Sequence, residues 1–144
     1  MPARPSTTID YATLADLRYQ IRRFIRRREL AARGAGVEPQ HYFVLLQIKG
    51  LEGRGGATIG ALAERLQISH HGAVQLVDRL ARRDMVVRRR VGRDRRHVVV
   101  ELRPAGRAAL RTLALYSIAE LRSEGPALVT TLKRLVGEAS RGGA

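Results

Sequence analysis

The feature that most constrains the fold is the stretch from Thr58 to Leu102, where two short helical patterns precede two valine-rich runs. Thr58 and Ser69 each stand directly before a helical pattern, where a hydroxyl can cap a helix N-terminus. Apolar residues recur at helical spacing after each cap: Leu62, Ala63 and Leu66 in the first pattern, and Ala73, Leu76, Val77 and Leu80 in the second. Only a few residues separate the patterns, so they predict a helix-turn-helix.

The two valine-rich runs, Val86–Val91 and His97–Leu102, predict the strands of a β-hairpin, with Gly92 free to adopt a positive φ at the turn. Residues 88–96 of this stretch carry six arginines and one carboxylate, Asp94; the arginines are Arg88, Arg89, Arg90, Arg93, Arg95 and Arg96. Like charges this close repel one another, so we expect an external anion to compensate for them. A helix-turn-helix followed by a basic hairpin is the winged helix arrangement, in which the hairpin is the wing.

Charge points to the same class of partner. The 144 residues suit a single domain with a real core, and the formal net charge is +14. The positive electrostatic field of such a charge attracts polyanions, nucleic acid first and an anionic membrane surface second. Lys49 and Lys133 are the only lysines, and arginine pairs readily with phosphates and base edges, although a GC-rich genome also favours arginine.

Several other classes are disfavoured. The chain has no cysteine, which removes disulfides and thiolate zinc sites. The first ten residues lack an apolar core, and no apolar run approaches the roughly 20 residues that span a bilayer, so we expect a cytoplasmic protein. His70 and His71 are adjacent, without the i, i+4 spacing of a helical zinc pair. No nucleophile motif, phosphate loop or carboxylate pair stands out, so we expect neither metal, cofactor nor catalysis.

Long helices flank the predicted winged helix. Tyr11 to Arg33 predicts a helix, capped by Asp10, with the apolar seam Leu14, Leu17, Ile21 and Phe24. A second helix is expected from Pro39 to about Gly50, with Phe43 and Leu46 facing inward and Leu45 as a further candidate for that face. The segment Glu52–Ala57 is expected to be a flexible link. Pro104 opens a long helix, Ser123–Pro126 is expected to break it, and a last helix is expected from Ala127 to about Ala139 with Leu128, Leu132, Leu135 and Val136.

Two stretches resemble the MarR family of bacterial transcriptional regulators. One is "LAERLQISHHGAVQLVDRLARRDMVVRR", from Leu62 to Arg89, and the other is "DRRHVVVELRPAG", where Asp94, Arg96, Leu102 and Gly106 match the family's wing pattern. Three positions depart from the family. Arg103 replaces a capping Thr, at a cost of roughly 1 kcal/mol, Asp84 stands where Gly is common, and Gly72 either lets DNA approach or is a tolerated weak helix residue.

The resemblance implies a mostly α-helical chain with a small β-hairpin wing, in which residues 9–35 and 104–140 are dimerisation helices around a winged helix-turn-helix region at 39–102. It also implies a homodimer, with two winged helices about one DNA turn apart. A two-fold dimer predicts a pseudo-palindromic site on double-stranded DNA. The apolar seams at the two ends of the chain agree with this, although they could also pack within one monomer.

The helix from Ser69 to Arg83 is expected to enter the major groove, with His70, His71 and Gln75 reaching bases and Arg79 and Arg82 holding phosphates. Asp78 is expected to neutralise Arg79 or Arg82 in part, and a simply solvated charged face is the alternative. By the resemblance, Asp94 braces Arg96 in the minor groove. We further expect Arg93 and Arg95 to flank Arg96, and the phosphate track to be lined by Arg88, Arg89 and Arg90.

Many members of the family bind small anionic aromatic molecules. By that analogy the candidates are Tyr19, Arg22, Arg23, His41 and Tyr42, although a basic helix and ordinary core packing would also explain them. The sequence therefore predicts a dimeric repressor that a small ligand releases from its operator. One alternative is a non-specific nucleoid-type or RNA-binding basic protein. Another is a peripheral membrane binder, which would leave the wing motif unexplained.

Overall fold

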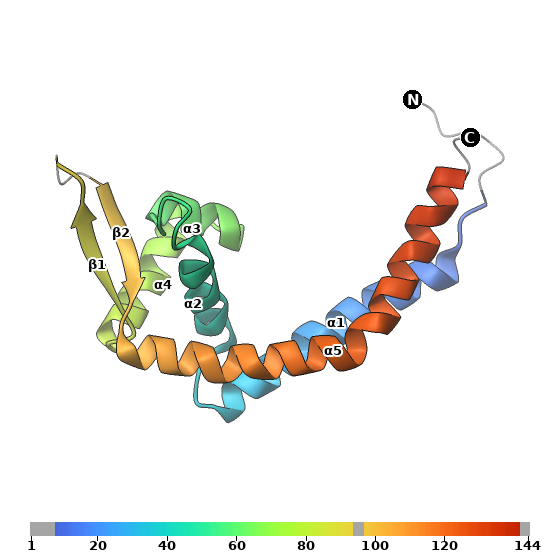
Figure 1. Cartoon of the computed structure of the whole chain (residues 1–144), viewed down its shortest axis with the longest axis horizontal. Coiled ribbons are helices and arrows are strands. Elements are labelled where there is room, and N and C mark those ends of the chain that lie inside the picture. The colour runs from blue at the N-terminus through green and yellow to red at the C-terminus, as the bar shows by residue number, and fades with distance from the viewer. Residues whose placement is uncertain (1–7, 94–96, 142–144) are drawn as a thin grey trace. The chain divides into compact units, whose positions relative to one another are not determined.

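The computed structural model describes residues 8–93 and 97–141, with side chains as far as 137. Its elements in chain order are α1 (Tyr11–Gly34), α2 (Pro39–Leu51), α3 (Ile59–Leu66), α4 (His70–Arg82), β1 (Val86–Val91), β2 (His97–Leu102) and α5 (Pro104–Arg141) (Figure 1). They form two compact units. We call residues 29–117 the winged unit, and residues 1–28 together with 118–144 the helical unit. In the described part of the chain no helix is both long and apolar enough to cross a bilayer.

The helix-turn-helix forms as the capping residues predict. The Thr58 hydroxyl accepts a hydrogen bond from the Ala61 amide at 3.1 Å, and the Ser69 hydroxyl accepts one from the Gly72 amide at 3.0 Å. The core of the winged unit packs the inner faces of α3 and α4 against α2, the hairpin and the start of α5. Its most deeply buried large side chains are Leu45, Ile48, Leu62, Leu80, His41, Val44, Val77 and Val86.

The hairpin has the predicted strands. β1 and β2 pair antiparallel, with Val86 opposite Leu102 and Val91 opposite His97. Opposite residues share a face of a hairpin, so Val86, Val100 and Leu102 lie on one face, and all three are buried. That inner face fixes the hairpin against the core, while Arg88, Arg89 and Arg90 of β1 remain exposed.

The expected inner face of α2 was wrong. Phe43 and Leu46 are 43% and 38% exposed, whereas the buried residues are His41, Tyr42, Val44, Leu45 and Ile48. Of the three expected inward residues, only Leu45 is buried. The helix is apolar on almost all sides, so periodicity alone could not select its inner face.

The segment from Glu52 to Ala57, which we expected to be a flexible link, consists of turns and ends in a pairing with the hairpin. The Val100 amide donates a hydrogen bond to the Ala57 carbonyl at 2.8 Å, so Ala57 pairs with β2. Gly56 has a φ of +83°, and a Cβ there would lie 2.9 Å from Val99 Cγ1. Glycine is therefore needed both for the backbone conformation and for the close approach to β2.

The expected helix break at Ser123–Pro126 is also wrong, because α5 continues through Pro126 as one helix to Arg141. Proline removes one helical hydrogen bond and clashes with the preceding turn, which costs about 3 kcal/mol. Ion pairs with α1 in the turns before Pro126 support the helix. Glu120 and Glu124 pair with arginines of α1.

Helix α1 begins as the sequence predicts. The Thr13 amide donates a hydrogen bond to Asp10 Oδ1 at 3.0 Å, and the Thr13 hydroxyl donates to Asp10 Oδ2 at 2.6 Å. Both bonds favour the ionised carboxylate, and they lower the pKa of Asp10 below its ordinary value. Asp10 is thus the predicted helix cap.

Candidate nucleic-acid interface

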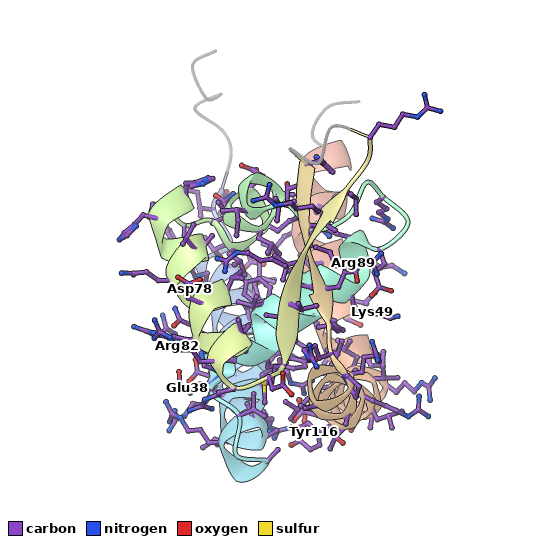
Figure 2. The ribbon with its side chains drawn as sticks, turned by 90° about the vertical axis from the view of Figure 1, so that its left-hand side faces the viewer. Glu38, Lys49, Asp78, Arg82, Arg89 and Tyr116 are labelled. Atoms are coloured by element: carbon purple, nitrogen blue, oxygen red, sulfur yellow. The ribbon has the colours of Figure 1, made fainter. Side chains whose placement is uncertain are left out.

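Helix α4 presents one face to the core and the opposite face to solvent. The core face is buried throughout, while the other carries the predicted DNA-binding residues, all exposed: His70, His71, Gln75, Arg79 and Arg82. Figure 2 shows Arg82 on this helix, together with Asp78. A buried core therefore holds a polar face whose N-terminal end carries the two histidines and Gln75 and whose C-terminal end carries arginines.

Gly72 has a structural explanation that the sequence did not offer. A Cβ at this position would lie 3.2 Å from the Ser69 hydroxyl, which is closer than most real Cβ contacts. That hydroxyl caps α4 through the Gly72 amide. A residue without a side chain therefore leaves room for the cap, at the end of the helix that carries His70 and His71.

The arginines of β1 lie on two different faces of the hairpin. Side chains alternate along a strand, so Arg88 and Arg90 leave β1 on the same side as the buried Val86, and Arg89 leaves on the other. Arg88 Nη1 lies 2.7 Å from Asp78 Oδ1 of α4. Arg89 Nη1 lies 3.3 Å from Glu101 Oε2 of β2, and Figure 2 labels Arg89 on the hairpin.

The expected partner of Asp78 was therefore wrong. We expected Asp78 to neutralise Arg79 or Arg82 on its own helix, but it pairs with Arg88 of the hairpin. Helix α4 packs against β1, so a strand side chain reaches the carboxylate in a geometry that the sequence could not reveal. Within the described residues, Arg79 and Arg82 have no carboxylate partner.

The far end of the hairpin is described in part. Arg90 and Arg93 are exposed, and neither has an ion pair with a residue that the structure describes. Asp94, Arg95 and Arg96 lie outside the described residues, so the bracing of Arg96 by Asp94 stays a prediction.

Two departures from the family pattern meet at the base of the wing. Asp84 has a φ of +61°, in the left-handed region, and its Oδ1 lies 3.0 Å from Arg103 Nε. The Arg103 amide donates to the Met85 carbonyl at 2.8 Å. A Cβ on Gly106 would overlap the Met85 carbonyl oxygen and lie 3.1 Å from its carbon. Gly106, a residue of the wing motif, thus lets α5 start against the turn before β1.

His41 lies at the start of α2 and is 1% exposed. Its Nε2 lies 3.4 Å from Glu38 Oε2, and neither ring nitrogen forms a hydrogen bond with a described residue. Glu38 Oε1 in turn lies 3.8 Å from Arg83 Nη2. Burial disfavours the charged imidazole and lowers the pKa of His41, although Glu38 partly opposes this shift.

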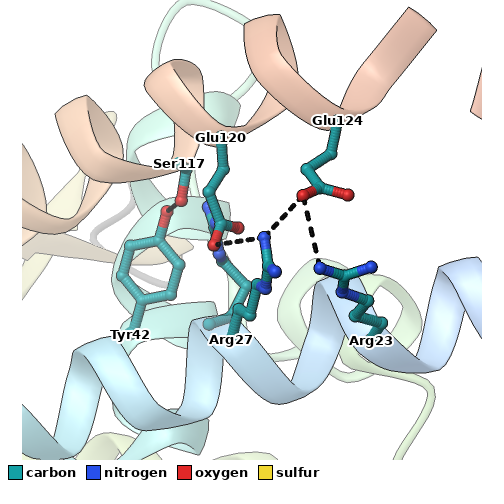
Figure 3. A network of polar contacts seen from close by, with 7 residues as sticks. Arg23, Arg27, Tyr42, Ser117, Glu120 and Glu124 are labelled. Atoms are coloured by element: carbon teal, nitrogen blue, oxygen red, sulfur yellow. Dashed lines mark hydrogen bonds and ion pairs between the residues drawn. The ribbon is translucent and has the colours of Figure 1, made fainter. Parts of the chain in front are cut away.

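The five ligand candidates do not share one environment. His41 and Tyr42 are buried in the winged unit, where the Tyr42 hydroxyl lies 2.8 Å from Ser117 Oγ (Figure 3). Tyr19 and Arg23 belong to the helical unit and line a cavity of about 140 Å³. Arg22 is exposed and is not among the residues that line this cavity.

Besides Arg23, charged residues that the sequence did not single out lie at or beside the cavity in the helical unit. Arg27 and Arg23 lie 2.7 Å and 3.6 Å from the same oxygen of Glu124 (Figure 3). Arg28 pairs with Glu120 and stacks on Phe24, with its guanidinium carbon 4.6 Å from the ring centre. The spacing of Glu120 and Glu124 was the available signal, since i, i+4 carboxylates share a helix face.

Comparison with known proteins gives a family match over part of the chain and a shared fold over nearly all of it. Residues 35–97 match the model of the MarR family. No curated protein matches the chain. Among solved structures, AbsC, a MarR family transcriptional regulator from Streptomyces coelicolor, is 20% identical with a TM-score of 0.70, and the match covers 97% of this chain and 99% of AbsC.

Two further structures have the same fold. BpsR from Bordetella bronchiseptica, whose DNA binding is regulated by 6-hydroxynicotinic acid, is 19% identical with a TM-score of 0.63, over 97% of this chain and 98% of that one. A mutant of S. aureus MepR bound to an oligodeoxyribonucleotide is 14% identical with a TM-score of 0.62, over 92% and 99%. Residues 35–97 of this chain are therefore similar to the MarR family, and the chain has the fold of AbsC, BpsR and MepR.

Proposed function

We propose that this protein is a sequence-specific DNA-binding transcription regulator that acts as a homodimeric repressor. The observation that carries the proposal is the exposed face of α4 beside the exposed arginines of β1, both held by one buried core. The net charge of +14 supplies the long-range attraction to DNA. A winged helix places such a helix in the major groove and its hairpin against the neighbouring backbone or minor groove.

The side chains divide by chemistry. His70, His71 and Gln75 lie in the first turns of α4, from which a recognition helix reaches base edges, and glutamine pairs well with adenine. Cations further along would hold phosphates: Arg79, Arg82 and Arg90. Asp94 and Arg96 are minor-groove candidates on the resemblance alone, and we expect Arg93 and Arg95 to flank Arg96. Arg88 differs from the others because Asp78 holds it.

The helical unit supports a homodimer. Its helices, within residues 9–35 and 104–140, expose large apolar side chains to a degree unusual for a stable monomer surface. These side chains are Leu14, Ile21, Ile25, Ile118, Leu121, Val129, Leu132 and Val136. A second copy of the chain would cover them, and two-fold symmetry would then present two α4 helices to a pseudo-palindromic operator.

The cavity in the helical unit supports release by a small ligand. Its walls combine the apolar and aromatic side chains Tyr19, Phe24 and Leu121 with two arginines and two glutamates, Arg23, Arg27, Glu120 and Glu124. A planar molecule with one carboxylate would pair with one of the two guanidinium groups and pack against the rings. The regulation of BpsR by 6-hydroxynicotinic acid offers a precedent in a protein of the same fold.

The deciding experiment is selection of bound duplexes from a random DNA pool with purified protein. We expect an inverted repeat with half-sites about 10 base pairs apart, preferred over random DNA by at least about a thousandfold. A pool without sequence preference, bound with a steep salt dependence, would contradict the proposal. That outcome would favour the non-specific nucleoid-type or RNA-binding protein instead.

Matched substitutions on α4 test the division of roles. Gln75→Ala should change which bases are preferred while leaving the salt dependence nearly unaltered. Arg79→Ala should weaken binding to all duplexes alike and reduce the salt slope by about one. If Gln75→Ala weakened binding to every duplex equally, Gln75 would be a backbone contact and not a base contact.

A further inference from the structure

Asp78 stands out among the charged groups on the exposed side of α4 and β1. It is a carboxylate on the helix that we propose to enter the major groove, where it would repel phosphates. Its neighbours on α4 include Arg79 and Arg82, but it forms its ion pair with Arg88 of β1, at 2.7 Å. The Arg88 side chain is 36% exposed and that of Asp78 is 39% exposed. The pair therefore lies at the surface, where α4 and the hairpin meet.

The pair joins the two elements that would read DNA. Arg88 leaves β1 on the hairpin's inner side, next to the buried Val86. That side packs against α4, so the guanidinium reaches Asp78. Arg90 leaves the same side two residues later without an ion pair among the described residues. The ion pair between Arg88 and Asp78 thus lies two residues before the exposed Arg90 on the same face of the hairpin.

We propose that Asp78 is a specificity-determining positioning residue, which acts through Arg88 to hold the hairpin in register with α4 and to keep one arginine off the phosphates. An arginine held by a carboxylate gains less from an arbitrary phosphate backbone, so binding to random DNA is weaker. A fixed hairpin contacts DNA well only when α4 is also seated on its preferred bases. Asp78 therefore lowers non-specific affinity more than specific affinity. This inference rests on the proposed DNA-binding function.

The test compares Asp78→Asn with Glu101→Gln. Glu101 is a matched control because it also pairs with a hairpin arginine and is 40% exposed, but it lies on the other face and contacts Arg89 instead of joining α4. Binding is measured across a salt series for the selected duplex and for a random duplex of equal length. Thermal melting of each variant verifies folding.

Asp78→Asn should lower the ratio of specific to random affinity by about fivefold and steepen the salt slope on random DNA by about one, as the released Arg88 takes up a phosphate. Adding Arg88→Ala to Asp78→Asn should remove the extra slope. Asp78→Glu, which keeps the carboxylate, should restore the ratio. Glu101→Gln should leave the ratio at the wild-type value.

Three outcomes would overturn the inference. In one, Asp78→Asn matches Glu101→Gln in both ratio and slope. In another, the extra slope persists without Arg88. In the third, Asp78→Asn alters the preference at a single base pair, which would make Asp78 a base contact. Binding by the wild-type chain distinguishes the two failures. If the wild-type chain prefers no duplex, the proposed function is wrong. If the wild-type chain has a preference and Asp78→Asn keeps it, only this inference is wrong.

Discussion

At the scale of single residues, Gly106 is the position where the fold leaves least room. A methyl group there would overlap the Met85 carbonyl, which is backbone and cannot rotate away. Gly106→Ala should therefore lower the free energy of unfolding by about 1–3 kcal/mol, as overpacking does, measured by urea unfolding. Gly60→Ala in α3 is the control, since nothing lies within 4 Å of its Cβ position. It should stabilise the chain by up to about 1 kcal/mol. Equal effects at both positions would contradict the argument.

The buried His41 makes stability depend on pH. Burial lowers its pKa in the folded chain, so below about pH 6.5 the unfolded chain takes up a proton that the folded chain does not. Stability should thus fall with decreasing pH by up to about 1.4 kcal/mol per unit from this group, and the loss stops at the lowered folded-state pKa. His41→Gln should remove that part of the slope between about pH 7 and pH 5. An unchanged slope would mean that other groups cause it.

Residue-scale predictions succeeded where the physics is local. The caps at Asp10, Thr58 and Ser69 depend only on residues three positions away, and all three form. The partner of Asp78 depends on how a strand packs against a helix, and the charges on α4 alone suggested the wrong arginine. The functional roles of the α4 residues remain predictions, because exposure permits a contact without naming what is contacted.

At the scale of elements, the proline inside α5 should lower the free energy of unfolding, which can be tested. Pro126 lies inside the helix, whereas Pro104 occupies its first position. Pro126→Ala should raise the free energy of unfolding by up to about 3 kcal/mol, while Pro104→Ala should change it little because the first amide of a helix has no helical partner. Both are measured by urea unfolding at one protein concentration. A loss of stability in Pro126→Ala would show that the proline geometry is itself required.

Element boundaries followed from strong local signals, and the errors came from weak or overridden ones. The hairpin strands were predicted residue for residue, because valine-rich runs flank a glycine turn. The inner face of α2 was predicted wrongly, because apolar residues lie on nearly all sides of this helix. The break at Pro126 is a sound local inference that tertiary contacts overcome. The pairing of Ala57 with β2 joins segments more than 40 residues apart and leaves no local trace.

At the scale of the whole molecule, the exposed apolar side chains of the helical unit predict the oligomeric state. The native protein should sediment at twice the chain mass of 16.0 kDa. Ile21→Glu with Ile25→Glu should produce monomers, because both side chains are about half exposed and burying two carboxylates in an apolar interface is costly. Ile21→Val with Ile25→Val, which keeps the same positions apolar, should leave the dimer intact. Dimers in both variants would contradict the assignment of this face.

The pair of Asp84 and Arg103 has an evolutionary consequence. Each residue departs from the family pattern, and the two side chains meet at 3.0 Å. Glycine at position 84 alone would leave Arg103 without this carboxylate partner. Threonine at position 103 alone would leave Asp84, which has a left-handed backbone, without this guanidinium partner. Each reversion thus gives up an exposed ion pair worth at most about 1 kcal/mol. The two sites should show epistasis: lineages that carry one substitution should tend to carry the other, and ancestral states should be regained together.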